Sequence, residues 1–269
     1  MNQEGLALRR NRHRLVVLAC AVCLAGWPGN LKAEPCRIAS HHEGVLFAVE
    51  GVGQTWLCRL QPIIEHYTTA NKVGPLRTAM SESVYRYLLD RPYLAAALIN
   101  RLEIGLHKSE PRGSGQFWGT DGEGTEGIIE LVHQDGNSRI YYLEGTHHSR
   151  KIPNLNGKAV VFLRMTPVKS ESGIESMDST MVAYTKLDSR VLSGLAWLVR
   201  PLVSGIVTRK LTKGVDVVNR LGLEMRHHPE RVMFEATDPP AFSEPDVVFL
   251  KEAIAFQPPT NGSTNIPKP

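Results

Sequence analysis

The segment Ser189–Met225, SRVLSGLAWLVRPLVSGIVTRKLTKGVDVVNRLGLEM, decides how the rest of the chain is interpreted. Its first half carries little charge, whereas its second half carries a charge on almost every turn. Apolar residues recur every three or four positions throughout, which is the spacing of one face of an α-helix. They are Leu192, Leu195, Val199, Val203, Val207, Leu211, Val215, Val218, Leu221 and Met225.

A helix packed on a soluble core explains both halves of this segment, whereas a membrane span explains only the first. A span needs about 20 apolar residues in succession. Arg200 interrupts the apolar half, and Arg209 and Lys210 close it. The unbroken helix would be about 50 Å long at about 1.5 Å per residue. Pro201 lacks the N–H of a helical hydrogen bond, so we expect a kink or a new start there.

The preceding residues predict two short helices and then an antiparallel meander. In residues 75–105, SESVYRYLLD and RPYLAAALINRL carry helical spacing, with Asp90 as a cap, Pro92 in a first turn and Gly105 as the end. From 114 to 188 the period changes to that of strands, and the turn at Asp135-Gly136-Asn137 predicts a hairpin. We expect four or five strands here, including a short one at GQFWGT.

Three further segments complete the predicted organisation. Residues 1–33 form a leader, and residues 34–74 form an N-terminal extension in which VLFAVE and TWLCRL suggest a hairpin around Gly51 and Gly53. The main domain is expected at 75–236. Residues 237–269 form a proline-rich tail, in which VVFLKEAIAF could dock on the domain and the last dozen residues are expected to be disordered.

The order of these elements resembles the START-like superfamily of helix-grip domains, which includes polyketide-cyclase-like (SRPBCC) and lipid-transfer domains. The resemblance covers residues 78–228: SVYRYLLDRPYLAAALINRL, the strands from Gln116 to Asp188, and RVLSGLAWLVRPLVSGIVTRKLTKGVDVVNRL. It implies an α+β fold in which a curved antiparallel sheet wraps around the long C-terminal helix. It also implies a cavity for an apolar ligand between sheet and helix, and no catalytic residues to carry over.

The side chains expected to line such a cavity come from alternate strand positions and from the long helix. The alternative is that they simply fill a core. The expected ligand-binding residues are Trp118, Tyr142, Val161, Leu163, Ala183, Trp197 and Val203. Glu144, Arg164 and Arg200 are candidate polar anchors, with solvent-facing positions on the convex side as the alternative for the two strand residues.

Motifs for catalysis, cofactors and metals are weak in this chain. GEGTEG at residues 122–127 fits a dinucleotide pattern, but IIELV after it predicts a strand rather than the required helix, so we expect a flexible turn. The histidine doublets at 41–42, 147–148 and 227–228 offer one side chain to each face, which predicts no metal site. We therefore expect neither a cofactor nor a catalytic set.

The leader and the cysteines predict export. RRNRHR, the apolar run LVVLACAVCLAGW and PGNLKA follow the order of a secretory signal, with cleavage expected after Ala33. Cys36 and Cys58 then remain, and an oxidising compartment favours a disulfide between them over two buried thiols. Residues 1–33 carry five of the 31 basic and one of the 27 acidic residues, which leaves 26 of each. A neutral mature chain argues against a nucleic-acid partner.

Together these features predict a bacterial protein of the periplasm or outer surface that binds a hydrophobic small molecule or lipid. An enzyme of the cyclase or hydrolase type using His147, Glu144 or Asp178 is one alternative. An envelope-associated scaffold with a filled core is another. The sequence leaves open a peripheral contact with a membrane, the oligomeric state and the identity of the ligand.

Overall fold

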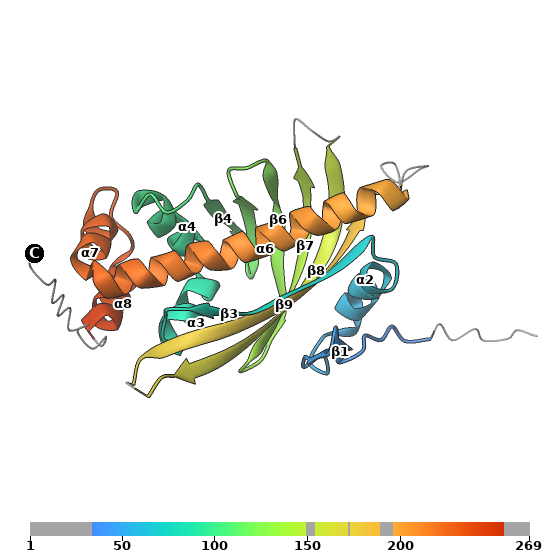
Figure 1. Ribbon diagram of the computed structural model, residues 1–269, viewed down its shortest axis with the longest axis horizontal. Coiled ribbons are helices and arrows are strands. Elements are labelled where there is room, and N and C mark those ends of the chain that lie inside the picture. Colours follow the sequence, from blue (N-terminus) through green and yellow to red (C-terminus); the bar gives the residue numbers. More distant parts are fainter. Residues whose placement is uncertain (1–33, 149–153, 172, 189–195, 256–269) are drawn as a thin grey trace, which may run out of the picture. The chain divides into compact units, whose positions relative to one another are not determined.

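The computed structural model describes residues 34–148, 154–171, 173–188 and 196–255. The described residues from Cys36 onward form one compact unit. In this unit seven strands form one antiparallel sheet (Figure 1). Two very short strands, β1 (His41–His42) and β2 (Val45–Leu46), pair separately. With the helices, this makes the fold α+β, as expected.

The large sheet has the strand order β3-β9-β8-β7-β6-β5-β4. Consecutive strands from β4 to β9 are neighbours, so the meander is confirmed, and β3 pairs with β9 to bring the first strand beside the last. The bounds are β3 Thr69–Thr78, β4 Lys108–Gly113, β5 Gln116–Thr120, β6 Thr125–Gln134, β7 Ser138–His147, β8 Leu155–Lys169 and β9 Glu175–Leu187.

The predicted pair of short helices is confirmed as α3 (Glu82–Asp90) and α4 (Pro92–Arg101). The Ser81 hydroxyl caps α3 by accepting from the N–H of Val84. Pro92 stands in the first turn of α4, where its missing N–H costs no hydrogen bond. A single residue, Arg91, separates the two helices, and α4 ends at Arg101, before the expected Gly105.

The long helix is α6, Ala196–His227, which continues past Pro201. Its buried side chains include Val203, Val217 and Leu221. The beginning of the predicted segment, residues 189–195, lies outside the described residues. Among the helices that the structure describes, none has the length and apolar character needed to cross a bilayer.

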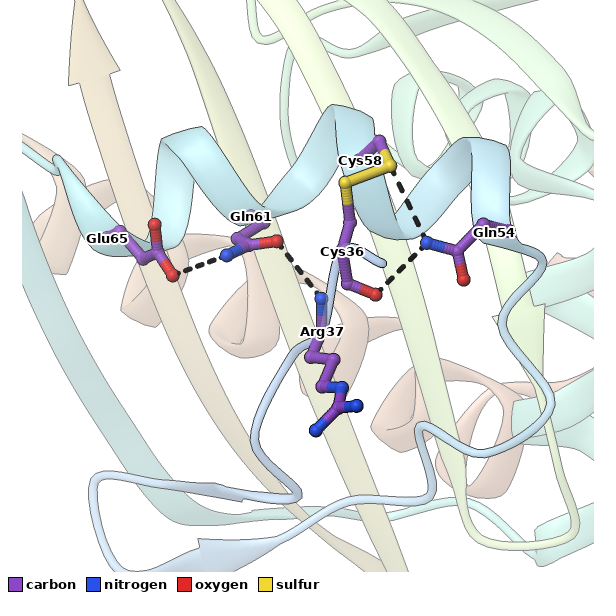
Figure 2. The surroundings of a disulfide bond; sticks show 6 residues. All are labelled: Cys36, Arg37, Gln54, Cys58, Gln61 and Glu65. Carbon is purple, nitrogen blue, oxygen red and sulfur yellow. Dashed lines mark hydrogen bonds between the residues drawn. A yellow bond between two sulfur atoms is a disulfide. The ribbon is translucent and has the colours of Figure 1, made fainter. Parts of the chain in front are cut away.

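Residues 54–65 form helix α2, so the hairpin expected around Gly51 and Gly53 is wrong. TWLCRL is too short for periodicity to separate a strand from a helix. Seen together with the residues that follow, Trp56, Leu60 and Ile63 recur at helical spacing. The predicted disulfide is confirmed: Cys36 is bonded to Cys58 on α2, and Gln54 of the same helix donates to the Cys36 carbonyl at 3.2 Å (Figure 2).

Strand β3 crosses the expected domain boundary at residue 75, so part of the predicted extension belongs to the sheet. Gly74-Pro75 hides this strand from sequence reasoning, because proline cannot donate to a ladder. The pairing with β9 shifts register between Val73 and Leu76, which breaks the alternation that marks a strand.

The segment expected as a tail also packs on the domain. It contains the end of α7 (Pro229–Thr237) and all of α8 (Glu244–Ala255), which lie beyond the C-terminal end of α6 in Figure 1. Leu250 is fully buried, and the Phe249 ring stacks on Tyr87 of α3 with centroids 3.5 Å apart. The buried Asp246 carboxylate accepts from the Tyr87 hydroxyl at 2.7 Å. The disorder expected at the end of the chain falls on residues 256–269, outside the described part.

Candidate binding site between the sheet and helix α6

The two faces of the sheet can be assigned from strand register, because directly paired residues share a face. Leu163 of β8 packs with α6 in one core cluster, and Val160 and Phe162 pack with α2 residues in another. The face toward α6 therefore carries two adjacent cross-strand rows. One row is Leu131, Tyr141, Val161, Ala183 and Asn71, and the next is Phe117, Ile129, Leu143, Ala159, Thr185 and Thr69.

Helix α6 buries apolar side chains against this face at two separate places. Near its N-terminal end Val203 packs with Leu155 and Leu187. In its C-terminal half a second cluster contains Val217, Leu221 and Met225 of the helix with sheet residues such as Leu163. On β8, Ala159 and Val161 lie between Leu155 and Leu163, so they face the stretch of α6 between the two clusters.

Six apolar side chains of the two rows form what we call the central apolar patch. Each is only partly buried, and none belongs to the core clusters that the described residues form. They are Phe117, Ile129, Leu131, Leu143, Ala159 and Val161. Because a well-packed core buries its large apolar residues almost completely, a half-buried patch on the sheet face toward a helix is suited to an apolar occupant.

A row of glycines borders this patch on four neighbouring strands. Gly119, Gly127, Gly145 and Gly157 are directly paired in register. A Cβ on Gly127 would lie 2.5 Å from the Glu144 carbonyl oxygen, and one on Gly145 would lie 2.4 Å from that of Glu126. These strands can approach so closely only because no side chain stands between them.

Polar contacts hold α6 at the β3 edge of the sheet. The Asn71 amide of β3 donates to the Ser204 hydroxyl at 2.7 Å and to the Thr208 hydroxyl at 2.9 Å. Asn71 is buried, so losing these partners would leave a polar group unsatisfied in the interior. This contact therefore sets the position of the helix along β3.

Ion pairs hold the middle of α6 to the loop between β5 and β6. The Lys210 ammonium lies 2.5 Å from an Asp121 carboxylate oxygen and 3.0 Å from one of Glu123, and Lys213 also pairs with Glu123. Hydrogen bonds from Lys213 and Lys210 lower the pKa of Glu123. Burial opposes ionisation of Asp121, but hydrogen bonds from Lys210 and two backbone N–H groups outweigh it and lower its pKa.

This loop contains the first half of GEGTEG, whose Gly122 and Gly124 serve the turn and its close packing. Gly124 has φ +90°, and a Cβ on it would lie 2.2 Å from the His148 carbonyl oxygen. Strand β6 begins within this stretch at Thr125 and continues through IIELV, which was expected to form a strand. The glycines thus allow Asp121 and Glu123 to reach the helix.

The candidate acid–base residues are not brought together. His147 shares the α6 face with Thr125, whose hydroxyl lies 2.9 Å from its Nδ1. Burial, followed by the charge of Lys210, lowers the pKa of His147. Glu144 and Asp178 both lie on the opposite face of the sheet. The Asp178 carboxylate forms an ion pair with the Arg77 guanidinium at 2.8 Å. Among the described residues no three histidine, cysteine or acidic side chains are grouped as metal ligands would be.

Three of the expected lining residues on strands lie on the α6 face: Val161, Leu163 and Ala183. Leu163 and Ala183 are buried, and Val161 belongs to the central apolar patch. Val203 of α6 packs in the cluster near its N-terminal end. The Trp197 side chain lies outside the described part of the helix, and Arg200 is exposed.

The other expected site residues lie on the α2 face. Tyr142 is buried there, with the Arg59 guanidinium of α2 over its ring at 4.0 Å, and its hydroxyl donates to Glu144 at 2.6 Å. Trp118 is paired with Ile128, which is paired in turn with Glu144, so Trp118 also lies on the α2 face. Arg164 donates to the Leu46 carbonyl at 2.9 Å, so neither strand residue expected as a polar anchor is near α6.

Sequence reasoning missed the polar residues that border the site. Asn71 lies on the strand that the Gly-Pro pair conceals, and in the sequence Lys210 indicates only the end of an apolar run. Arg139 of β7 is buried on the α6 face, where it is paired with Leu163. An arginine between two runs of apolar strand residues is the signal that could have identified it.

Comparison with known proteins does not assign the chain to a family. No protein-family model matches it, and no curated protein matches its sequence. One similar solved structure is the crystal structure of a conserved protein from Geobacillus kaustophilus, with 12% sequence identity and a TM-score of 0.41. The match covers 59% of this chain and 96% of that one. A TM-score this low does not establish a shared fold, so function is argued from the geometry of this chain.

Proposed function

We propose that this chain is an exported binding protein that holds a hydrophobic small molecule or lipid between its sheet and α6. The central apolar patch carries the proposal, because its six side chains lie on the sheet face toward α6 yet stay partly exposed. Covering such a surface with an apolar ligand gains about 25 cal/mol per Å² before the costs of association.

The proposed architecture is a helix-grip domain similar to the START-like superfamily, with the sheet curved around α6. Its support is the order of two short helices, a meander and a long helix. The contacts of Asn71 at one side of the helix and of Lys210 at the other are also those expected of a helix held across a bent sheet. The glycine row would supply the bend.

Export to the periplasm or outer surface is part of the proposal. The Cys36–Cys58 disulfide is compatible with it, since such bonds persist in oxidising compartments. We expect the protein recovered from the periplasm of a bacterial host to begin at Glu34, as measured by intact-mass spectrometry and N-terminal sequencing. Recovery of the uncleaved chain from the cytoplasm would contradict export.

Ligand binding is tested on the full mature protein purified from the periplasm. We expect native mass spectrometry to show a co-purifying apolar molecule, and N-phenyl-1-naphthylamine, a neutral fluorescent probe, to bind and be displaced by lipid extract. If no molecule co-purifies and the probe does not bind, the core is filled and the scaffold alternative is favoured.

A matched pair of variants locates the ligand. Val161→Trp adds bulk to the central apolar patch, whereas Ile128→Trp adds the same ring on the other face of the sheet. We expect Val161→Trp to abolish probe binding with little change in stability, because it occupies open space, and Ile128→Trp to retain binding. In a filled core, Val161→Trp would instead destabilise the protein by about 1–3 kcal/mol through overpacking.

A further inference from the structure

Arg139 is a buried cation whose hydrogen-bonding capacity the protein does not fill. Its side chain is 4% exposed, and its Nη2 lies 2.7 Å from an Asp90 carboxylate oxygen. Neither Nε nor Nη1 has an acceptor in good hydrogen-bond geometry among the described residues. Leaving donors of a guanidinium unsatisfied in the interior is costly, so this residue calls for an explanation beyond its single ion pair.

Asp90 compensates the charge of the buried Arg139 only from a solvent-exposed position. The Asp90 side chain is 47% exposed, so water screens much of its charge. The Arg139 charge acts on Tyr85 of α3, and a side-chain hydrogen bond connects Arg139 with Tyr141. Both phenols are neutral groups, so they do not compensate the Arg139 charge.

Two phenol groups share the surroundings of Arg139. Burial raises the pKa of Tyr85 and of Tyr141, and the Arg139 charge opposes this rise at both. Both therefore stay protonated at neutral pH, and the Tyr85 hydroxyl lies 2.8 Å from the Ser179 hydroxyl. A cation beside protonated phenols is a donor-rich environment suited to an anionic oxygen.

The central apolar patch begins one row away from Arg139. On β7, Tyr141 is the next residue on the same face, and it is paired directly with Leu131 and Val161 of the patch. Same-face positions along a strand are about 7 Å apart. An acidic head group at Arg139 would consequently place its apolar chain on the patch without leaving the α6 face.

We propose that Arg139 binds the acidic head group of a long-chain fatty acid whose hydrocarbon chain lies on the central apolar patch. The inference rests on the proposed binding function and adds the ligand class. One guanidinium matches the single negative charge of a carboxylate, and charge-assisted hydrogen bonds to it are the strong kind.

The test compares a fatty acid with its uncharged ester on the full mature protein. We expect cis-parinaric acid to bind at least about ten-fold more tightly than its methyl ester at neutral pH, which corresponds to one strong charge-assisted contact. Arg139→Gln should abolish this preference and leave binding of the ester and of N-phenyl-1-naphthylamine unchanged.

Asp90→Asn separates head-group binding from a structural ion pair. This substitution removes the carboxylate that competes with the ligand, so we expect it to increase the preference for the acid over the ester. A purely structural ion pair predicts instead that Asp90→Asn and Arg139→Gln lose the same stability and that the preference does not change. This variant also keeps the test decisive if Arg139→Gln does not fold.

The inference is overturned if wild type does not distinguish acid from ester, if Arg139→Gln keeps the preference, or if Asp90→Asn does not increase it. In those cases binding of the neutral probe would leave the proposed function standing. Failure of every probe, the neutral one included, would overturn both. A preference shown equally by a soluble alkyl phosphate at Arg139 would replace the carboxylate by a phosphate as the ligand.

Discussion

Gly145 lies where neighbouring strands leave no room for a side chain. It faces Gly127 and Gly157 on the neighbouring strands, and any Cβ there would collide with backbone rather than with a movable side chain. We expect Gly145→Ala to lower the free energy of unfolding by about 1–3 kcal/mol, as overpacking does. Urea denaturation followed by circular dichroism measures the loss.

Gly136→Ala is the matched control, because a Cβ on Gly136 would meet nothing within 4 Å. This variant should be neutral or stabilise by up to about 1 kcal/mol through the unfolded state. Equal effects of the two substitutions would mean that the glycine row does not enforce close approach of the strands.

At the scale of elements, the ion pairs between α6 and the β5–β6 loop should make stability depend on pH. The pKa values of Asp121 and Glu123 are lowered in the folded state, so their contribution is present above the ordinary carboxyl range near pH 4 and is lost as pH falls below it. We expect Lys210→Met to cost about 1 kcal/mol at neutral pH, the size usual for a partly exposed pair.

This cost should shrink toward zero in acid, where both carboxyls are protonated even in wild type. Urea denaturation at a series of pH values measures it, and Lys251→Met, on the exposed side of α8, is the control that should change stability little at any pH. A Lys210→Met effect that is independent of pH would contradict the ion-pair explanation.

For the whole molecule, the Cys36–Cys58 bond connects the start of the described chain to the helix that covers one face of the sheet. The cysteines are 22 residues apart, for which loop-closure entropy gives about 3 kcal/mol. The Cys36→Ser/Cys58→Ser variant should lose about that much free energy of unfolding. Dithiothreitol should produce the same loss in wild type and none in the variant; a wild-type midpoint insensitive to reductant would contradict the prediction.

Local patterns were sufficient for much of the architecture. Helix α6, the pair α3 and α4, and the meander from β5 to β9 each follow from periodicity within one segment and from turn residues such as Pro92 and Asp135-Gly136. The disulfide followed from the cysteine count and the expected compartment. The helices and the meander depend on interactions between residues close in sequence. The disulfide could be predicted because each cysteine has a single possible partner.

The arrangement of the site required long-range pairing. Tyr141 and Tyr142 are adjacent and chemically alike, yet one faces α6 and the other packs under Arg59 of α2. Which of them faces inward depends on a register that a one-residue shift would invert. The same holds for Glu144 and Arg164, whose faces no local pattern could assign.

The amino-acid order was therefore enough to identify the long helix, its neighbours and the covalent bridge, because their signals lie within a few turns of chain. The pairing of β3 with β9, the faces of the strands and the burial of Arg139 depended instead on contacts between residues far apart in sequence. Such contacts form only when the strands pair in one particular register. The position of the central apolar patch follows from that register.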